Sequence, residues 1–274
     1  MLPALLAGLD TGLYPAQCEH QQEIEAHFGD ATYRPLLPLE QEQLQSLRLH
    51  VVAFSNRSGS TLLTSLLHQA GAGVPPRAEV FNSDSVIAVA QEHGIPSFTD
   101  YFLQVILGWA HNGAVGFKVG PRQLFWLTRA GLLDSLGEVK LVNTLREDVI
   151  AQAVSLYLAR QTGQWHSDMS ASRQASAITY SREGILQALQ TVAIDQYLVR
   201  YYVGLHSVDA ITVTYEQLMA NTEDTVREVL EFLDLPDCAG GTIDPASVAI
   251  RRQATAHNKE LADKFRTEFA LSLR

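Results

Sequence analysis

The stretch from Leu49 to Ala70 constrains the fold more than any other part of the chain. Leu49 and the apolar run Val51–Phe54 are typical of a buried strand. A tight polar loop follows at 55–61, and four leucines at 62, 63, 66 and 67 then recur at helical spacing. A strand joined by a short loop to a helix is the repeating unit of α/β domains, so the sequence predicts that class.

The loop Ser55–Thr61 has the chemistry of an anion site. A loop that opens a helix aims several backbone N–H groups at one point, and the helix dipole adds partial positive charge there. Gly59 allows a ligand to approach the backbone, and Arg57 offers a forked cation suited to phosphate or sulfate oxygens. A second interpretation stays open, in which the serines and threonine only cap the helix.

The loop does not match the Walker A pattern, which needs a glycine five residues before the second glycine and a lysine directly after it. Those two positions hold Phe54 and Ser60. An ATP-binding loop of the usual P-loop kind is therefore disfavoured.

Composition narrows the class of partner. The net charge is −10 and the pI about 5.3, which disfavours nucleic acid, because proteins that bind phosphate backbones carry a basic footprint. Cys18 and Cys238 are too few and too far apart for a disulfide framework or a thiolate metal site. We expect a cytoplasmic protein without a membrane partner, because the first residues lack a secretory signal and no apolar run approaches the ~18 residues of a membrane span.

We expect residues 1–46 to be an N-terminal extension of unknown role and 47–274 to be a single domain. Alternating apolar runs and helical patterns predict the further elements. The strands expected are Ala114–Val119, Glu138–Leu145 and Ala210–Val213. The main helices expected are Ser83–Glu92, Thr99–Trp109, Gln123–Ala130, a helix from Val149, Ser181–Leu205, Thr222–Phe232 and Asn258–Glu268.

Three charged residues stand where such a sheet binds ligands, at the carboxyl ends of its strands. We expect the extended segment Arg77–Asn82 to return beside the first strand, which brings Glu79 near the loop. Lys118 lies in an apolar strand, and Arg146 follows another. Each also has an ordinary interpretation: a surface carboxylate for Glu79, a lysine that snorkels to water, and a solvated arginine.

Together these segments resemble the sulfotransferase family of bacterial trehalose 2-sulfotransferase. The residues that carry the resemblance occur in family order from about Leu49 to the C-terminus. They are Arg57-Ser58-Gly59-Ser60-Thr61-Leu62-Leu63, Gly116-x-Lys118, Arg146-x-Asp148-Val149-x-x-Gln152-Ala153-Val154-Ser155, Gln161-Thr162 with Trp165, and Arg252-Gln253-Ala254.

The resemblance implies a P-loop-like sulfotransferase fold with a central, mainly parallel sheet flanked by helices. It implies that 3′-phosphoadenosine-5′-phosphosulfate (PAPS) donates a sulfuryl group to a hydroxyl and leaves as the 3′,5′-bisphosphate PAP, without a metal ion. By similarity the loop from Arg57 to Leu62, with Ser58, Gly59, Ser60 and Thr61, holds the phosphosulfate, and Arg146 with Ser155 holds the 3′-phosphate. Arg252 and Gln253 close over the nucleotide, Glu79 is the base, and Arg57 and Lys118 supply positive potential.

One departure concerns Glu79, because the family places its glutamate two residues after a proline, whereas Pro76 is three residues before Glu79. A homodimer would also resemble the family. The acceptor is a small polar metabolite, either a sugar or a product of secondary metabolism such as a guanidinium alkaloid. The alternatives are a P-loop-type small-molecule kinase and a catalytically inactive nucleotide-binding or interaction protein.

Overall fold

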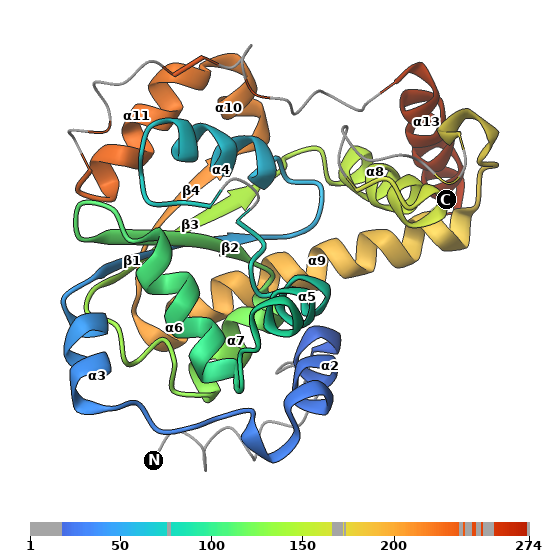
Figure 1. Cartoon of the computed structure of the whole chain (residues 1–274). Helices are drawn as coiled ribbons and strands as arrows, with labels where there is room; N and C mark the ends of the chain where they lie inside the picture. The colour runs from blue at the N-terminus through green and yellow to red at the C-terminus, as the bar shows by residue number, and fades with distance from the viewer. Residues whose placement is uncertain are drawn as a thin grey trace.

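A computed structural model describes residues 18–75, 78–165, 172, 174–235, 238, 243–244, 248 and 255–272. Its centre is a four-stranded sheet in the order β2-β1-β3-β4, with every neighbouring pair parallel (Figure 1). The strands are β1 (Arg48–Phe54), β2 (Ala114–Val119), β3 (Val139–Leu145) and β4 (Asp209–Thr214). This confirms the α/β fold with a central parallel sheet that the sequence predicts.

Helices cover both faces of the sheet. One face is covered by α4 (Ser60–Gln69), α10 (Tyr215–Ala220) and α11 (Thr222–Phe232), which contact β1 and β4. The other is covered by α5 (Ser83–His93), α6 (Phe98–Trp109), α7 (Pro121–Arg129) and the long α9 (Arg182–His206). Both layers can be followed in Figure 1. Successive side chains of β1 point to opposite faces of the sheet. Val51 and Ala53 join the core under α7 and α9, whereas Val52 joins the core under α4 and α11.

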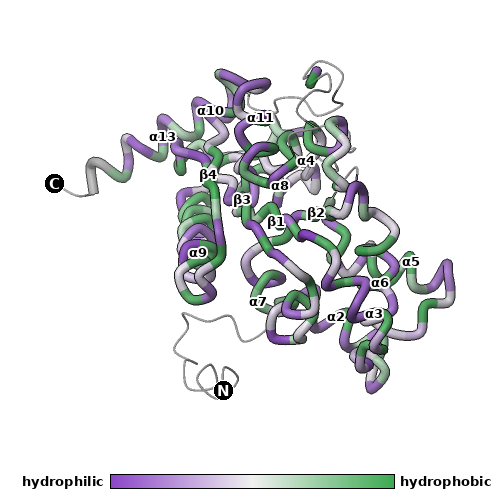
Figure 2. The backbone as a smooth tube through the Cα atoms, turned by 90° about the vertical axis from the view of Figure 1, so that its left-hand side faces the viewer, coloured by the Kyte–Doolittle hydropathy of each residue, from purple (hydrophilic) through white to green (hydrophobic). Residues whose placement is uncertain are grey.

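A third cluster lies beside the sheet and joins α8 (Val149–Thr162), the first half of α9 and α13 (Ala256–Ser272). Two further helices, α2 (Glu19–Phe28) and α3 (Pro38–Gln45), bring Ile24 and Leu44 into the main core. The strands are largely green in Figure 2, whereas the peripheral helix α13 shows several purple stretches. Among the described residues, no helix is both long and apolar enough to cross a membrane.

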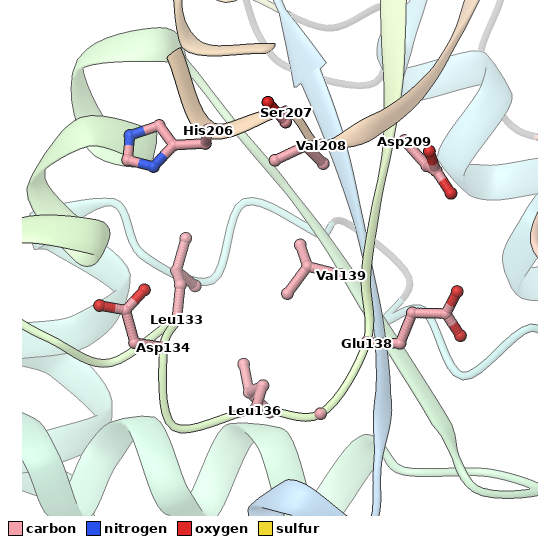
Figure 3. Close-up of a pocket in the computed structure, with 10 residues that line it drawn as sticks. Leu133, Asp134, Leu136, Glu138, Val139, His206, Ser207, Val208 and Asp209 are labelled. Carbon is pink, nitrogen blue, oxygen red and sulfur yellow. The ribbon is translucent and has the colours of Figure 1, made fainter. Parts of the chain in front are cut away.

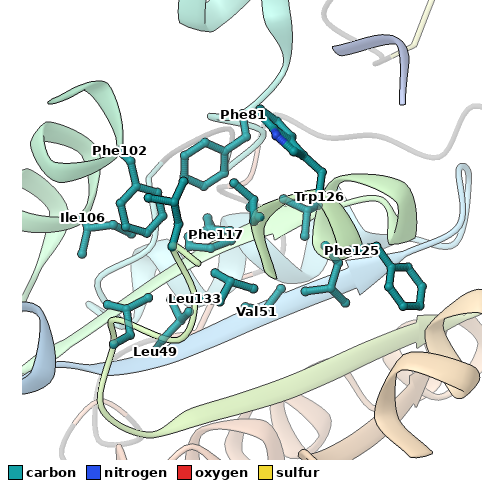
Figure 4. Packing of buried hydrophobic residues seen from close by; sticks show 14 of the residues in the cluster. Leu49, Val51, Phe81, Phe102, Ile106, Phe117, Phe125, Trp126 and Leu133 are labelled. Atoms are coloured by element: carbon teal, nitrogen blue, oxygen red, sulfur yellow. The ribbon is translucent and has the colours of Figure 1, made fainter. Parts of the chain in front are cut away.

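Aromatic side chains fill the main core near β2 (Figure 4). The Phe81 ring meets the Phe117 ring edge-on at 4.7 Å between centroids and stacks on the Phe102 ring at 5.7 Å. Trp126 stacks on Phe98 at 4.7 Å. Aromatic pairs add about 0.5–1.5 kcal/mol each beyond burial of their area, so the segment that carries Phe81 is firmly anchored.

The predicted strands and main helices are confirmed, with ends that shift by a few residues. One expectation was wrong. The segment after α4 does not return beside β1 but runs along the outer edge of β2. There Gly116 N–H donates to Gly73 O at 3.0 Å and Lys118 N–H donates to Ala78 O at 2.9 Å. The place beside β1 is taken by β2 itself, in which Gly116 pairs with His50.

His50 is a buried imidazole in the middle of β1, 3% exposed. Its Nε2 has no hydrogen-bond partner among the described residues, and a Cβ on Gly116 would lie only 2.0 Å from that atom. The ring therefore fills the space that glycine leaves. Desolvation lowers the pKa of His50 from 6.5 to about 4, so the ring is neutral at pH 7.

Acidification should therefore destabilise the fold through His50. In the unfolded chain His50 takes up a proton below pH 6.5, whereas in the native state it does so only near pH 4. The contribution of His50 to the free energy of unfolding is therefore fully present above pH 6.5 and is lost as the pH falls towards 4. The loss is on the order of 3 kcal/mol. Urea unfolding of the wild type and His50→Gln at several pH values measures it, and the variant should lose most of this slope.

Asp195 on α9 contributes a slope of opposite sign in the same pH range. Its carboxyl is buried and its pKa is raised from 3.8 to about 6, so stability from this group is lost as the pH rises through that interval. Asp195→Asn should therefore steepen the acid loss that His50→Gln removes. The comparison is sharpest in chains that carry Asp195→Asn. If the free energy of unfolding depends on pH equally with His50 and with His50→Gln in that background, the assignment to His50 is contradicted.

Candidate functional site

The loop between β1 and α4 lies at the carboxyl edge of the sheet, above the point where the strand order reverses. The connection from β1 leads to β2 on one side, and β3 lies on the other side. Ligands of open α/β sheets bind in this crevice. Ser58 Oγ and Thr144 Oγ1 of β3 lie 2.8 Å apart, both buried, so the loop is fastened to the neighbouring strand.

Gly59 forms the N-cap of α4 in a left-handed conformation with φ of +89°. A Cβ at this position would lie 2.8 Å from Cδ2 of Tyr215, the first residue of α10. The position therefore needs glycine for two reasons, backbone conformation and the close approach of the tyrosine ring. No side chain caps α4. The alternative in which the loop only caps the helix is therefore not supported by the contacts.

A buried amide braces the loop from the opposite side. Gln152 on α8 is fully buried, and its Nε2 donates to Ser55 Oγ at 2.9 Å and to Asn56 O at 2.8 Å. Gln196 of α9 donates in turn to Gln152 Oε1 at 3.3 Å. The start of the loop is thus held by the two helices that pack beside the sheet.

Lys118 and Glu79 form an ion pair beside the loop, with 2.7 Å between Lys118 Nζ and Glu79 Oε1. The ammonium also donates to Thr61 Oγ1 at 2.6 Å and lies 5.2 Å from the centroid of the Phe54 ring. Burial lowers the pKa of Lys118, and the charge of Glu79 opposes that shift. Lys118 does not snorkel, because its side chain is only 1% exposed.

Arg57 extends along the loop towards α8. Its Nε donates to Ser155 Oγ at 2.9 Å, and its Nη1 donates to the carbonyl of Trp165. The backbone of Arg57 is left-handed, with φ of +68°, which is uncommon for a residue other than glycine and is enriched at functional sites. Desolvation and then the nearby charge of Arg146 lower the pKa of Arg57 to about 10.

Arg146 follows β3 and lies over the ring of Tyr215, with 4.9 Å between Cζ and the ring centroid. Its Nε is shielded from water and has no hydrogen-bond partner among the residues that the structure describes. A buried cationic donor without an acceptor is costly, so the geometry favours an anion as the missing partner.

The structure thus gathers most of the sequence-predicted residues at one edge of the sheet: the Arg57–Leu62 loop, Glu79, Lys118, Arg146 and Ser155. Leu62 lies in the first turn of α4 and packs on the adjoining core. Arg252 and Gln253 lie outside the described residues. Sequence reasoning missed Tyr215, although its place directly after the last strand was a signal that could have drawn attention to it.

A pocket among the described residues lies elsewhere (Figure 3). It has a volume of about 440 Å³ and is lined at the amino ends of β3 and β4 by residues that include Glu138, His206 and Asp209. This is the opposite end of the strands from the loop. The pocket therefore takes no part in the site.

The contact between Gly59 and Tyr215 can be tested by Gly59→Ala. A left-handed alanine costs ~1–2 kcal/mol, and displacement of the tyrosine ring should add to it. Gly71→Ala is the matched control, because φ is +79° there but nothing lies within 4 Å of the added Cβ. Chemical unfolding should show a larger loss of stability for Gly59→Ala by ~1 kcal/mol or more. Equal losses would show that Tyr215 does not restrict the loop.

Comparison with known proteins supplies the family. A model of the Stf0 sulphotransferase family matches residues 127–268, just over half of the chain. Trehalose 2-sulfotransferase of Mycobacterium tuberculosis (strain ATCC 35801 / TMC 107 / Erdman) is 24% identical over 263 residues, which cover 82% of this chain and 96% of that protein.

Two solved structures are also similar at low identity. The sulfotransferase domain from the Synechococcus PCC 7002 olefin synthase has 17% identity and a TM-score of 0.37, and covers 80% of this chain and 94% of its own. Sulfotransferase STF9 from Mycobacterium avium has 13% identity and a TM-score of 0.42, and the match covers 90% of this chain and 73% of that one. The family model, which spans the last two strands and the helices around them, shows that this chain belongs to the Stf0 sulphotransferase family.

Proposed function

We propose that this protein transfers a sulfuryl group from PAPS to a hydroxyl of a small polar metabolite and releases PAP. The observation that carries the proposal is the pair of cations at the carboxyl edge, Arg57 and Arg146. Burial and then the charge of Arg146 lower the pKa of Arg57. The buried Arg146 Nε has no partner among the described residues. A polyanionic ligand would relieve both costs at once.

The fit to a donor with two separated anionic groups rests on the positions of these side chains. The loop N–H groups and Arg57 would hold the phosphosulfate end, at the N-terminus of α4. Arg146 and Ser155 would hold the 3′-phosphate. In the structure Ser155 Oγ accepts from Arg57 Nε, so Arg57 would bridge the two proposed subsites. Arg252 and Gln253 are proposed to close over the nucleotide by family likeness alone.

PAPS, when bound, supplies an activated sulfuryl group whose bond to the phosphate oxygen breaks as a bond to the acceptor oxygen forms. Glu79 would take the proton that the acceptor hydroxyl gives up. Lys118 lies between Glu79 Oε1 and Thr61 Oγ1 of the loop, at 2.7 and 2.6 Å. The ammonium thus joins the base to the loop and adds positive potential where charge develops on the leaving group.

The net charge of the protein supports a proposal about the acceptor class. The protein carries −10 net charge, and we assign Arg57, Lys118 and Arg146 to the donor. An acidic surface raises the local concentration of cations and lowers that of anions. We propose an acceptor that is neutral or cationic, either a sugar or a hydroxylated guanidinium compound.

The first experiment is binding of PAP. A ligand that binds only the native state raises the melting temperature, so thermal scans with PAP should show stabilisation that grows with concentration. Arg146→Ala should weaken binding about 10- to 100-fold, because a charge-assisted contact contributes ~1.5–3 kcal/mol. Arg227→Ala is the control, since that arginine lies on the exposed surface of α11. Stabilisation by ATP with magnesium, but none by PAP, would favour the kinase alternative.

The second experiment concerns the base. Glu79→Gln keeps the shape and a hydrogen-bonding side chain but cannot take a proton, so transfer should slow by ~10²–10⁴. The measurement is transfer of labelled sulfate from PAPS to a panel of sugars, phenols and polar natural products. Binding of PAP should persist in the variant. Full turnover by Glu79→Gln would assign proton removal to another group.

The third experiment separates the two acceptor classes by salt. Attraction of a cation to an acidic surface is screened, so its KM should rise between ~0.05 and ~0.5 M salt. The KM of a neutral sugar should change little over the same range. A preference for a carboxylated or sulfated acceptor would contradict the proposal about the acceptor.

A further inference from the structure

The segment 78–82, which carries Glu79, is held at nearly every carbonyl. Ala78 O accepts from Lys118 N–H at 2.9 Å, and Val80 O accepts from Tyr101 Oη at 2.5 Å. Phe81 is fully buried, and its carbonyl accepts from Gln123 Nε2 at 3.0 Å. Ala78 itself is left-handed, with φ of +58°, a conformation that costs an alanine ~1–2 kcal/mol. The fold thus imposes a defined path on this segment.

Asn82 ends the segment and occupies the N-cap position of α5. Asparagine is favoured there because its side chain usually accepts from the first turn of the helix. In this protein the Asn82 side chain makes no cap hydrogen bond. Its Nδ2 instead donates to Glu79 Oε2 at 2.9 Å. The amide is therefore turned away from the helix it could stabilise and towards the carboxylate.

Gln123 fixes which end of the Asn82 amide faces Glu79. Gly120 N–H donates to Gln123 Oε1 at 3.0 Å, so the other end of the Gln123 amide, Nε2, must be the donor. That nitrogen donates to Asn82 Oδ1 at 2.9 Å as well as to Phe81 O. With Oδ1 occupied, Asn82 presents Nδ2 to the carboxylate. The hydrogen bonds therefore all point the same way, from Gly120 N–H after β2 through Gln123 and Asn82 to the Glu79 carboxylate.

We propose that Asn82, oriented by the buried Gln123, is a positioning residue that fixes the Glu79 carboxylate for proton removal from the acceptor. This inference rests on the proposed function, in which Glu79 is the base. Lys118 holds Oε1 and Asn82 holds Oε2, at 2.7 and 2.9 Å. Each carboxylate oxygen retains further acceptor capacity. The side chain of Glu79 is 24% exposed, which leaves it accessible to an acceptor.

Both contacts also favour the charged carboxylate, because each is a hydrogen bond to the ionised form. Removal of the Asn82 donor should therefore change the titration of Glu79, whereas a merely structural asparagine would affect stability alone. Asn82→Asp is the sharpest variant. It changes one NH₂ group to oxygen, keeps a favoured N-cap residue, and sets a second carboxylate against Glu79 Oε2.

The test follows the Glu79 carboxyl by ¹³C NMR in protein labelled at glutamate. The signal is identified by its absence in Glu79→Gln. In Asn82→Asp the titration midpoint of Glu79 should rise by about one pH unit or more, as for carboxylates that share a site. In Asn82→Ser, which retains a cap former but cannot reach Glu79, the midpoint should rise by a smaller amount.

Asn221→Asp is the matched control. Asn221 is also an N-cap residue whose side chain makes no cap hydrogen bond, at the start of α11, so the variant adds the same charge at the same kind of position. It should leave the Glu79 midpoint within about 0.3 unit, since exposed charges at a distance are screened. A midpoint that does not move in Asn82→Asp overturns the inference. Failure of the wild type to bind PAP overturns the proposed function, and the NMR result does not depend on that outcome.

Kinetics give a second readout. Asn82→Ser should lower kcat about tenfold while the KM for PAPS stays within about twofold, because the change affects the base and not the donor loop. A rise in the KM for PAPS with an unchanged kcat would contradict a positioning role at Glu79.

Discussion

The ion pair between the buried Lys118 and the partly exposed Glu79 is the contact on which the carboxyl edge of the sheet depends. A lysine that is 1% exposed needs a partner for its charge, because burial of an unpaired ammonium is costly. The same ammonium reaches Thr61 in the first turn of α4. One nitrogen atom, Lys118 Nζ, therefore fixes three separate segments relative to one another: α4, β2 and the segment 78–82.

The two arginines at this edge are held by different contacts. Arg57 donates to a hydroxyl and a carbonyl, both neutral, and Arg146 rests on the face of Tyr215. The fold thus pairs Lys118 with a carboxylate, and it holds Arg57 close enough to Arg146 that the charge of Arg146 helps to lower the pKa of Arg57. A native state that carries such a cost at one place is typical of a ligand site.

Local patterns predicted the strands and the residues that follow them, because apolar runs, helical spacing and strand-end positions are local properties. The loop, Lys118 and Arg146 were found in this way. Contacts between distant segments were less accessible. The path of the segment before Glu79 along β2, rather than β1, depends on which strand occupies the neighbouring position in the sheet. The roles of Asn82 and Gln123 depend on side-chain orientation, and both residues look like ordinary helix-start residues in the sequence.

The contacts that Gly73 and Ala78 make with β2 also cover an edge of the sheet. An open strand edge with unpaired N–H and C=O groups is a template for pairing with another chain. Here Gly73 and Ala78 accept from the outward N–H groups of Gly116 and Lys118, so the chain covers its own exposed edge. The residues that cover the edge lead directly into the proposed base. Substitutions that displace this segment would therefore uncover a strand as well as move Glu79, so loss of activity and aggregation would arise together.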